Sequence, residues 1–321
     1  MTTAPVHRTV AGQGVRLAVA ERGLEHETTI VMIHGWPDTK ALWNPIADHL
    51  AADYHVVTYD VRGAGESGHP TERDAYRIEV LVEDLAAIID ATSTGPVHLV
   101  GHDWGAVQGW EAAGIDFGGW LASFTSISGP SLDHSGYAIR AQLRGGPRAL
   151  VALADQVMRF GYILTFATPV PRRIRRSGPT SRINRSARRF LARALQLVEH
   201  HPPDPDHPAP AVAWDAAHGT QMYLANILRR LRYPNERATD VPVQIIEATR
   251  DPVVRKLSID ASEPWVANLR RRHLPGGHWM VRSHPTEIAA WIAEFVKFTS
   301  GGHQSTELCD TRVDGHLPRR A

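Results

Sequence analysis

The stretch "VHLVGHDWGAVQGW", residues 97–110, joins a strand pattern to a helix pattern through a turn of small residues. Gly101 and Gly105 flank three residues with the spacing of a nucleophile elbow, a tight strand-to-helix turn that holds one side chain above the end of a sheet. Such a turn usually presents a serine, but this one presents Asp103. We therefore expect Asp103 to be a nucleophile with a carboxylate in place of a hydroxyl.

The segments on both sides of this turn alternate between strand and helix patterns, which is typical of a parallel α/β sheet. Further strand patterns occupy residues 15–21, 28–36, 54–63, 121–130 and 241–252. Helical spacing occupies residues 82–91 and 284–298, the second with Pro285 near its first turn. The pattern predicts one α/β domain built around the turn at Asp103.

The strand pattern is absent between residues 134 and 235, where helix and loop signals dominate. Helices inserted between two strands of a parallel sheet cover the carboxyl ends of the strands, where such sheets bind ligands. We therefore predict a helical lid at 134–235, inserted in a core of residues 1–133 and 236–300. Its basic run, 171–189, favours a solvated face over an anionic ligand, lipid headgroup or partner. Residues 301–321 lack periodicity and are expected to form a disordered tail.

The composition excludes several classes of protein. The net charge of the 321 residues is only +1, so no overall field favours nucleic acid. A single cysteine, Cys309, excludes an internal disulfide and a cysteine-based metal site. The N-terminus lacks the apolar stretch of a signal peptide, and no apolar run approaches the roughly 20 residues that cross a bilayer. We expect a cytoplasmic protein without nucleic-acid partners or integral membrane association. The composition is compatible with a homodimer.

Two further residues complete the order nucleophile, acid, histidine. Asp251 lies just past "VPVQIIEAT", residues 241–249, which is the strand part of the pattern at 241–252. His278 lies in "LPGGHWM", residues 274–280, past the last expected strand. An aspartate in this position orients the histidine and compensates its charge, while the histidine activates water. We expect the three side chains to converge at the carboxyl ends of parallel strands.

The motif "HGWPDT", residues 34–39, also follows a strand pattern. A tight turn there can direct the backbone N–H of Trp36 into the site. The N–H of Trp104, the residue after Asp103, would supply the second donor of an oxyanion hole. His34 and His102 are expected to shape their turns rather than to take part in chemistry.

Five motifs in this order, "HGWPDT", "DVRGAGESG", "GHDWGA", "RDPVV" and "GGHW", resemble the α/β-hydrolase fold in its epoxide-hydrolase and dehalogenase branch. The resemblance covers roughly residues 8–300. It implies a mostly parallel eight-stranded sheet with flanking helices and a helical lid, and no cofactor or metal. It also implies a covalent ester on Asp103, which His278-activated water hydrolyses. An ionised carboxylate attacks an sp³ carbon directly, and an epoxide or a carbon–halogen bond offers such a carbon.

The leaving group separates the two activities of this branch. Epoxide hydrolases present two lid tyrosines to the ring oxygen, and a tyrosine remains protonated near neutral pH because its pKa is about 10. "MRFGYILTF" and "GTQMYLANILRR" resemble the segments around them, which identifies Tyr162 and Tyr223, with Tyr137 and Tyr233 as alternatives. Together with Trp36 and Trp104, these tyrosines are expected to bind the substrate.

The sequence thus predicts a hydrolase that opens a lipophilic epoxide to a vicinal diol. The first alternative is a haloalkane dehalogenase with the same nucleophile. Many dehalogenases carry Asn in place of Trp36, and fluoroacetate dehalogenases usually carry Arg in place of Trp104, so both residues weaken that alternative. The second is a ligand-binding protein without catalysis, because a fold alone never proves activity.

Overall fold

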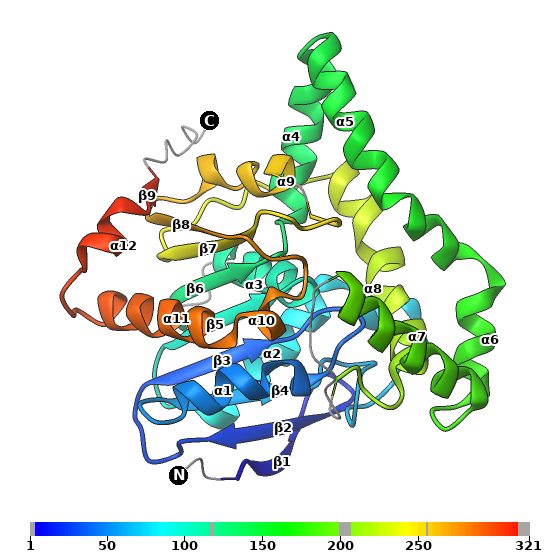
Figure 1. Ribbon diagram of the computed structural model, residues 1–321, viewed down its shortest axis with the longest axis horizontal. Helices are drawn as coiled ribbons and strands as arrows, with labels where there is room; N and C mark the ends of the chain where they lie inside the picture. Colours follow the sequence, from blue (N-terminus) through cyan, green and yellow to red (C-terminus); the bar gives the residue numbers. More distant parts are fainter. Residues whose placement is uncertain (1–3, 116–118, 199–206, 255, 314–321) are drawn as a thin grey trace.

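A nine-stranded, mostly parallel sheet forms the centre of the computed structural model (Figure 1), which describes residues 4–115, 119–198, 207–254 and 256–313. The strands are β1 (Val6–Ala11), β2 (Arg16–Arg22), β3 (Thr29–Ile33), β4 (His55–Tyr59), β5 (Val97–His102), β6 (Leu121–Ile127), β7 (Val243–Ala248), β8 (Leu269–Leu274) and β9 (Arg312–Val313). Their order is β1-β2-β4-β3-β5-β6-β7-β8-β9. The pairings from β4 to β8 are parallel, and β1–β2, β2–β4 and β8–β9 are antiparallel.

Helices cover both faces of the sheet, which explains why every residue of β3, β4 and β5 is buried. One core cluster contains side chains of α2 (Ile78–Thr92) and α3 (Trp104–Gly114). The other contains side chains of α1 (Asn44–Leu50) and α11 (Pro285–Thr299). The remaining elements around the sheet are short: η1 (Lys40–Trp43), η2 (Arg73–Tyr76), α9 (Lys256–Asp260), η4 (Glu263–Trp265) and α10 (Met280–Ser283). This architecture confirms the predicted α/β class.

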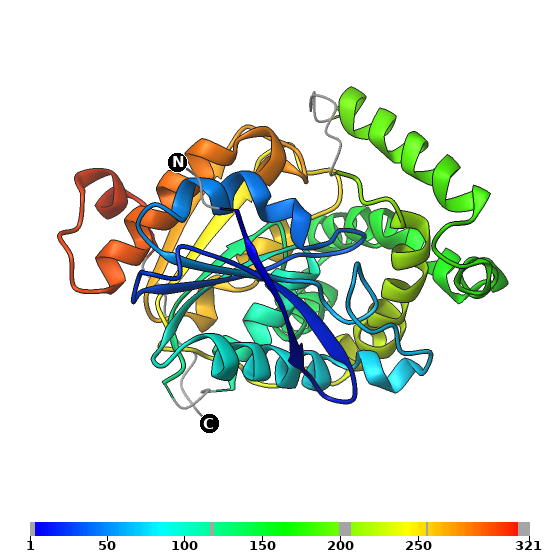
Figure 2. The same cartoon turned by 90° about the horizontal axis from the view of Figure 1, so that it is seen from below.

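Between β6 and β7 the described residues form helices and loops but no strand, as expected from the loss of the strand pattern (Figures 1 and 2). They are α4 (Leu132–Arg144), α5 (Pro147–Arg159), η3 (Phe160–Ala167), α6 (Pro169–Ser177), α7 (Arg182–Val198) and α8 (Val212–Arg232). We call these six elements the helical segment. α4, α6 and α7 all pack against α8. α8 is therefore its central helix.

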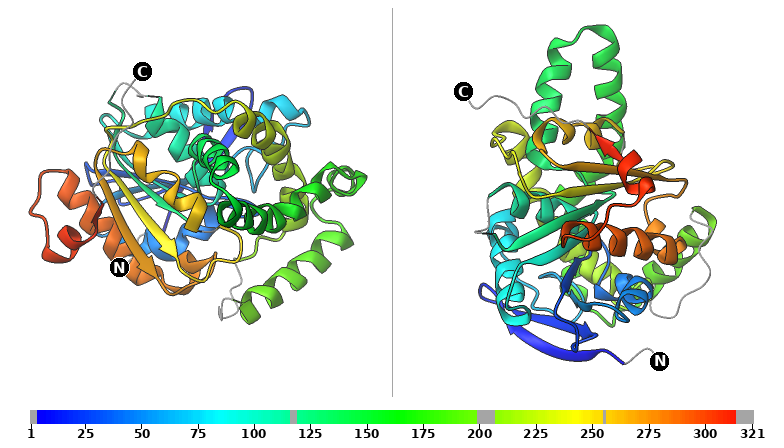
Figure 3. Two further views of the ribbon diagram at one scale, coloured as in Figure 1. Left: turned by 90° about the horizontal axis from the view of Figure 1, so that it is seen from above. Right: turned by 90° about the vertical axis from the view of Figure 1, so that its left-hand side faces the viewer.

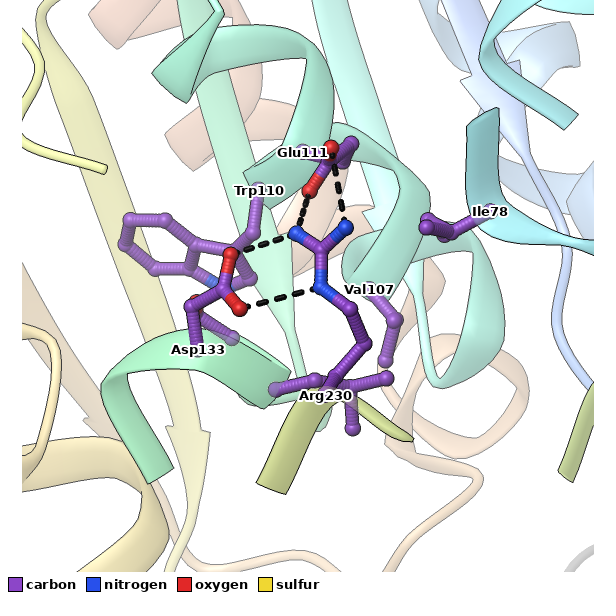
Figure 4. A pocket seen from close by; sticks show the side chains of 8 residues that line it. Ile78, Val107, Trp110, Glu111, Asp133 and Arg230 are labelled. Carbon is purple, nitrogen blue, oxygen red and sulfur yellow. Dashed lines mark hydrogen bonds and ion pairs between the residues drawn. The ribbon is translucent and has the colours of Figure 1, made fainter. Parts of the chain in front are cut away.

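A buried ion cluster joins α8 to the core (Figure 4). The guanidinium of Arg230 lies between the carboxylates of Glu111 on α3 and Asp133 on α4 and donates hydrogen bonds to both. One turn earlier on α8, the amide oxygen of Asn226 accepts from the backbone N–H of Ile78 at 2.8 Å, where α2 begins. These groups are almost fully buried, so their mutual contacts must replace the water that they lose on folding.

The C-terminal residues differ from the expectation of a disordered tail. They form α12 (Thr306–Asp310) and β9, which extends the predicted eight strands to nine by pairing with β8. Leu308 is fully buried, and the hydroxyl of Ser305 accepts from its backbone N–H at 3.0 Å. Both elements are too short to produce a periodic pattern in the sequence. Residues 314–321 lie outside the described part of the chain.

Candidate active site

Asp103 occupies the turn between β5 and α3 with a strained backbone, at φ 52° and ψ −120°. A positive φ is unfavourable for a residue with a side chain and persists only where the surroundings enforce it. Two glycines allow the close packing of this turn. A Cβ on Gly105 would overlap the carbonyl oxygen of Ile33, and a Cβ on Gly35 would overlap the side chain of Asp103. The turn therefore has the form that the Gly-x-Asp-x-Gly spacing predicts.

Two backbone donors face the carboxylate of Asp103. The N–H of Trp36, in the loop after β3, donates to Oδ1 at 2.7 Å. The N–H of Trp104 at the start of α3 also donates to this carboxylate. The structure thus brings together the two N–H groups that the sequence assigned to an oxyanion hole. Such donors stabilise negative charge on an oxygen that they already face.

His278 lies between the other two predicted residues. Its Nδ1 is 2.8 Å from Oδ2 of Asp251, and its Nε2 is 3.6 Å from Oδ2 of Asp103. The other oxygen of Asp251 accepts from the backbone N–H groups of Val253 and Val254, at 2.7 and 2.9 Å. These bonds fix Asp251 behind the imidazole ring. The ring consequently presents Nε2 to the space beside Asp103.

Asp251 and His278 are buried, the side chain of Asp103 is only 12% exposed, and the charges of the three groups influence one another's pKa values. Burial raises the pKa of Asp103 to about 6, although the nearby His278 and the two N–H donors oppose the rise. Burial disfavours the charged form of His278, but the attraction of Asp251 and Asp103 prevails and raises its pKa to about 9. Burial also opposes ionisation of Asp251, yet His278 lowers the pKa of that carboxyl. Near neutral pH the site therefore holds two carboxylates around one imidazolium.

Asp38, the acid of the "HGWPDT" motif, is a fourth charged residue at the site that the sequence analysis missed. Its carboxylate accepts from Nε1 of Trp279 at 2.9 Å and lies 2.6 Å from Nε2 of His207, which follows α7 in the chain. Burial opposes its ionisation, but the attraction of His207 lowers the pKa of Asp38 to about 2. Asp38 is thus an anion that helps to keep His278 protonated. Its position within a site motif was the only signal in the sequence.

His34 and His102 both bond to the backbone. Nε2 of His34 accepts from the N–H of Val61 at 2.9 Å, and Nε2 of His102 donates to the carbonyl of His278 at 2.8 Å. Burial lowers the pKa of His102 to about 4, so its ring is neutral at pH 7. Among the described residues, no group of three or more His, Cys, Asp or Glu side chains could hold a metal ion.

Tyr223 projects from α8 into an aromatic cluster above the turn. Its ring lies 4.9 Å from the rings of Trp104 and Phe166 and 5.6 Å from that of Trp36, measured between centroids. The indole N–H of Trp36 also donates to the carbonyl of Ala216 on α8 at 2.8 Å. Tyr223 is therefore next to both residues whose N–H groups face Asp103.

The other predicted tyrosines either lie away from this aromatic cluster or have a side chain outside the described residues. Tyr162 belongs to η3, and its side chain lies outside the described residues. The hydroxyl of Tyr137 donates to the carbonyl of Pro234 at 3.4 Å. Tyr233 is 67% exposed. Of the two alternatives, neither joins the aromatic cluster around Trp36.

An apolar pocket of about 430 Å³ lies beside the helix that carries Tyr223. Ile227, one turn after Tyr223, lines it together with aliphatic side chains of α4, η3 and α9, including Leu132, Ile163 and Leu257. The residues that line it carry no charge. This pocket suits an alkyl chain.

None of the described helices is both long and apolar enough to cross a membrane.

Comparisons with known proteins agree with this architecture. The "Probable oxidoreductase EphD" of Mycobacterium tuberculosis (strain H37Rv) is 35% identical over 313 residues, which cover 94% of this chain and 51% of that protein. The chain therefore spans about half the length of that relative. "Epoxide hydrolase A" of the same strain is 29% identical over 332 residues, which cover 91% of this chain and 98% of that protein.

The solved structures support the fold. A Bacillus megaterium epoxide hydrolase in complex with an inhibitor matches with a TM-score of 0.74 at 24% identity, covering 90% of this chain and all of that one. A family model described as "alpha/beta hydrolase fold" matches residues 28–285, which is most of the chain. The chain therefore belongs to the family of proteins with the alpha/beta hydrolase fold.

Proposed function

We propose that the chain is an epoxide hydrolase that opens an epoxide to a vicinal diol through a covalent ester on Asp103. One observation carries the proposal: a carboxylate occupies the strained turn, with the N–H of Trp36 at 2.7 Å and Nε2 of His278 at 3.6 Å. A carboxylate needs no base to attack an sp³ carbon. The similarity to Epoxide hydrolase A supports the epoxide as the electrophile.

In the first step, Oδ2 of Asp103 attacks a ring carbon because Oδ1 is held by Trp36. The new carbon–oxygen bond forms as the carbon–oxygen bond of the ring breaks, and the ring oxygen takes a proton from a tyrosine hydroxyl. We assign this role to Tyr223 and, from the sequence resemblance, to Tyr162. The ester carbonyl oxygen, Oδ1, then already lies beside the two N–H donors.

Before the second step, His278 gives up its proton, which restores the tyrosine hydroxyl through solvent. The neutral imidazole of His278 then takes a proton from water, and the resulting hydroxide attacks the ester carbonyl carbon of Asp103. The negative charge that develops on Oδ1 is stabilised by the N–H groups of Trp36 and Trp104. Asp251 stabilises the imidazolium of His278. The tetrahedral intermediate then expels the diol, and Asp103 is again a carboxylate.

We further propose that residues 134–235 act as a lid on a core of residues 1–133 and 236–300. The contact of Tyr223 with Trp36 and Trp104 supports this division, because a residue of the segment then completes the site. The aliphatic pocket beside α8 favours a lipophilic epoxide. The cytoplasmic location and the homodimer stay predictions from the sequence.

A panel of alkyl epoxides and haloalkanes tests the reaction class. We expect diol from epoxides that carry an alkyl chain, and no halide from 1-chloro- or 1-bromoalkanes of the same length. Diol is measured by chromatography and halide by ion-selective detection. Halide release without diol would identify a dehalogenase, and tight binding of both without turnover would identify a protein that only binds such ligands.

Removing the hydroxyl of Tyr223 tests its proposed role as the proton donor to the ring oxygen. In Tyr223→Phe the ring packing against Trp104 is kept, but the ring oxygen loses a proton donor as it becomes an alkoxide. We expect ester formation to slow by about 10–100-fold while ester hydrolysis keeps its rate. Single-turnover rapid quench resolves the two steps. Tyr233→Phe, which removes an exposed hydroxyl, is the matched control; equal rates in both variants would contradict the assignment.

The dependence on pH follows from the two shifted pKa values. Ester formation needs ionised Asp103, so its rate should fall as the pH decreases through about 6. Ester formation removes the charge of Asp103, which helps to hold the pKa of His278 at about 9. His278 should therefore lose its proton more readily in the ester, and hydrolysis should reach its plateau below pH 9. Single-turnover rates of both steps across the pH range measure this.

His278→Gln provides the control for the acidic limb. The positive charge of His278 lowers the pKa of Asp103, so its removal should move the midpoint of ester formation to a higher pH. An unchanged or lower midpoint would mean that another group controls this limb.

A further inference from the structure

The exposed large apolar side chains are concentrated in one part of the molecule. Among the described residues, all of them except Val6, Leu24 and Trp120 lie between Leu143 and Tyr233. Scattered exposed apolar residues are normal on a protein surface. Their concentration in about a third of the chain instead indicates a surface that contacts an apolar environment.

α7 carries the most regular part of this surface. Ile183, Phe190 and Leu197 are 49%, 76% and 77% exposed, and they recur every seven residues, about two helical turns. They therefore form one stripe along the helix. The opposite side of α7 is the packed one, because Asn184 and Leu195 are buried there. α7 lies at the outer edge of the molecule (Figures 2 and 3), and the exposure of its three stripe residues shows that they lie on its solvent side.

Positive charge lies directly beside the stripe. Every charged residue from Phe160 to Val198 is an arginine, nine in all, although the whole chain has a net charge of only +1. Arg182, Arg185, Arg189 and Arg193 are exposed on α7. Arg185 and Arg189 donate to the backbone carbonyls of Thr180 and Arg185. In the described part of the chain, no acidic side chain neutralises these four guanidinium groups.

We propose that the exposed face of α7 docks the protein on the surface of an anionic lipid bilayer. A helix with an apolar stripe next to a row of basic side chains lies in the plane of the membrane interface. The stripe enters the boundary between headgroups and acyl chains, and the arginines contact lipid phosphates. The docking needs no spanning helix and does not depend on the proposed reaction.

Other occupants fit this face less well. In a twofold dimer the same patch meets itself, and the arginines of two copies would repel one another. Nucleic acid would pair with the arginines but leaves the stripe of Ile183, Phe190 and Leu197 without a partner. The sequence alone favoured a solvated face for the basic run 171–189. The exposed apolar stripe beside it instead favours contact with a lipid surface.

Sedimentation with vesicles tests the proposal on the full-length protein. We expect it to pellet with phosphatidylcholine vesicles that contain phosphatidylglycerol and to stay in solution with phosphatidylcholine alone. Binding should weaken as salt is added. The double variant Arg185→Glu/Arg189→Glu should weaken the partition by at least about tenfold, because each basic side chain near the surface contributes to the attraction. Phe190→Ser/Leu197→Ser should do the same without a change in charge.

The matched control is Arg16→Glu/Arg73→Glu, which changes the net charge equally but on the exposed surface of the core. It should bind vesicles like the unaltered protein. The proposal is overturned if the unaltered protein does not pellet with anionic vesicles, or if both arginine variants lose binding equally. It is also overturned if Phe190→Ser/Leu197→Ser instead converts a dimer to a monomer in light scattering, or if duplex DNA retains the protein through the same residues.

Discussion

Asp103→Ala is expected to abolish diol formation, with a loss of about 10⁴-fold or more in turnover. Without the carboxylate no ester can form, and the remaining His278 has no carbonyl carbon at which to direct water. The oxyanion donors would also face an empty position. Initial rates with an alkyl epoxide measure the loss. Circular dichroism and a thermal melt check that the strained turn at β5 still folds.

Isotope labelling tests the same residue without mutation. In a single turnover in ¹⁸O-water, the diol should contain the older ¹⁶O from Asp103, and the solvent oxygen should remain in the enzyme. Mass spectrometry of the diol and of the peptide with residues 97–110 detects both. A labelled diol in that first turnover would mean that water attacks the epoxide directly, even if the protein proves to be an epoxide hydrolase.

His278→Gln is expected to trap the ester rather than to prevent it. Glutamine keeps a polar side chain beside Asp103 but cannot take a proton from water, so the second step should slow by about 10²–10⁴-fold. With excess reactive epoxide, the intact mass should increase by the mass of one substrate. Peptide mapping should place the addition on Asp103.

The double variant Asp103→Ala/His278→Gln is the control for this trap and should gain no mass. An adduct on any other residue would show that the nucleophile is not Asp103. Rapid turnover by His278→Gln without an adduct would show that another base activates the water.

The sequence predicted most of the site because its residues stand where strands end. Asp103, Asp251 and His278 each follow a strand pattern, and carboxyl ends of parallel strands meet at one edge of a sheet. The contact between Asp38 and His207 could not be predicted in this way. The two residues are 169 positions apart, and His207 follows no strand that would align it with Asp38.

Two of the elements missed by the pattern depend on tertiary contacts. β9 has two residues and α12 has five, and both form because the edge of β8 and the burial of Leu308 stabilise them. In the sequence, nothing distinguishes Arg230 from the other arginines at the end of α8. Its burial follows only from the meeting of Glu111 and Asp133, which come from two other helices.

Arg230 limits how the helical segment can be exchanged between related proteins. A donor segment grafted in place of α4 to α8 would keep Glu111 in the host but bring its own residues at positions 133 and 230. If the graft supplies a neutral residue for Arg230, Glu111 loses its buried cation and keeps only the partly exposed Arg237 at 3.1 Å, and the loss of one partner of a buried ion pair costs up to about 3–5 kcal/mol. Chimeras should therefore exchange position 111 together with the segment, so that the crossover points follow the charge cluster rather than the boundary between strands and helices.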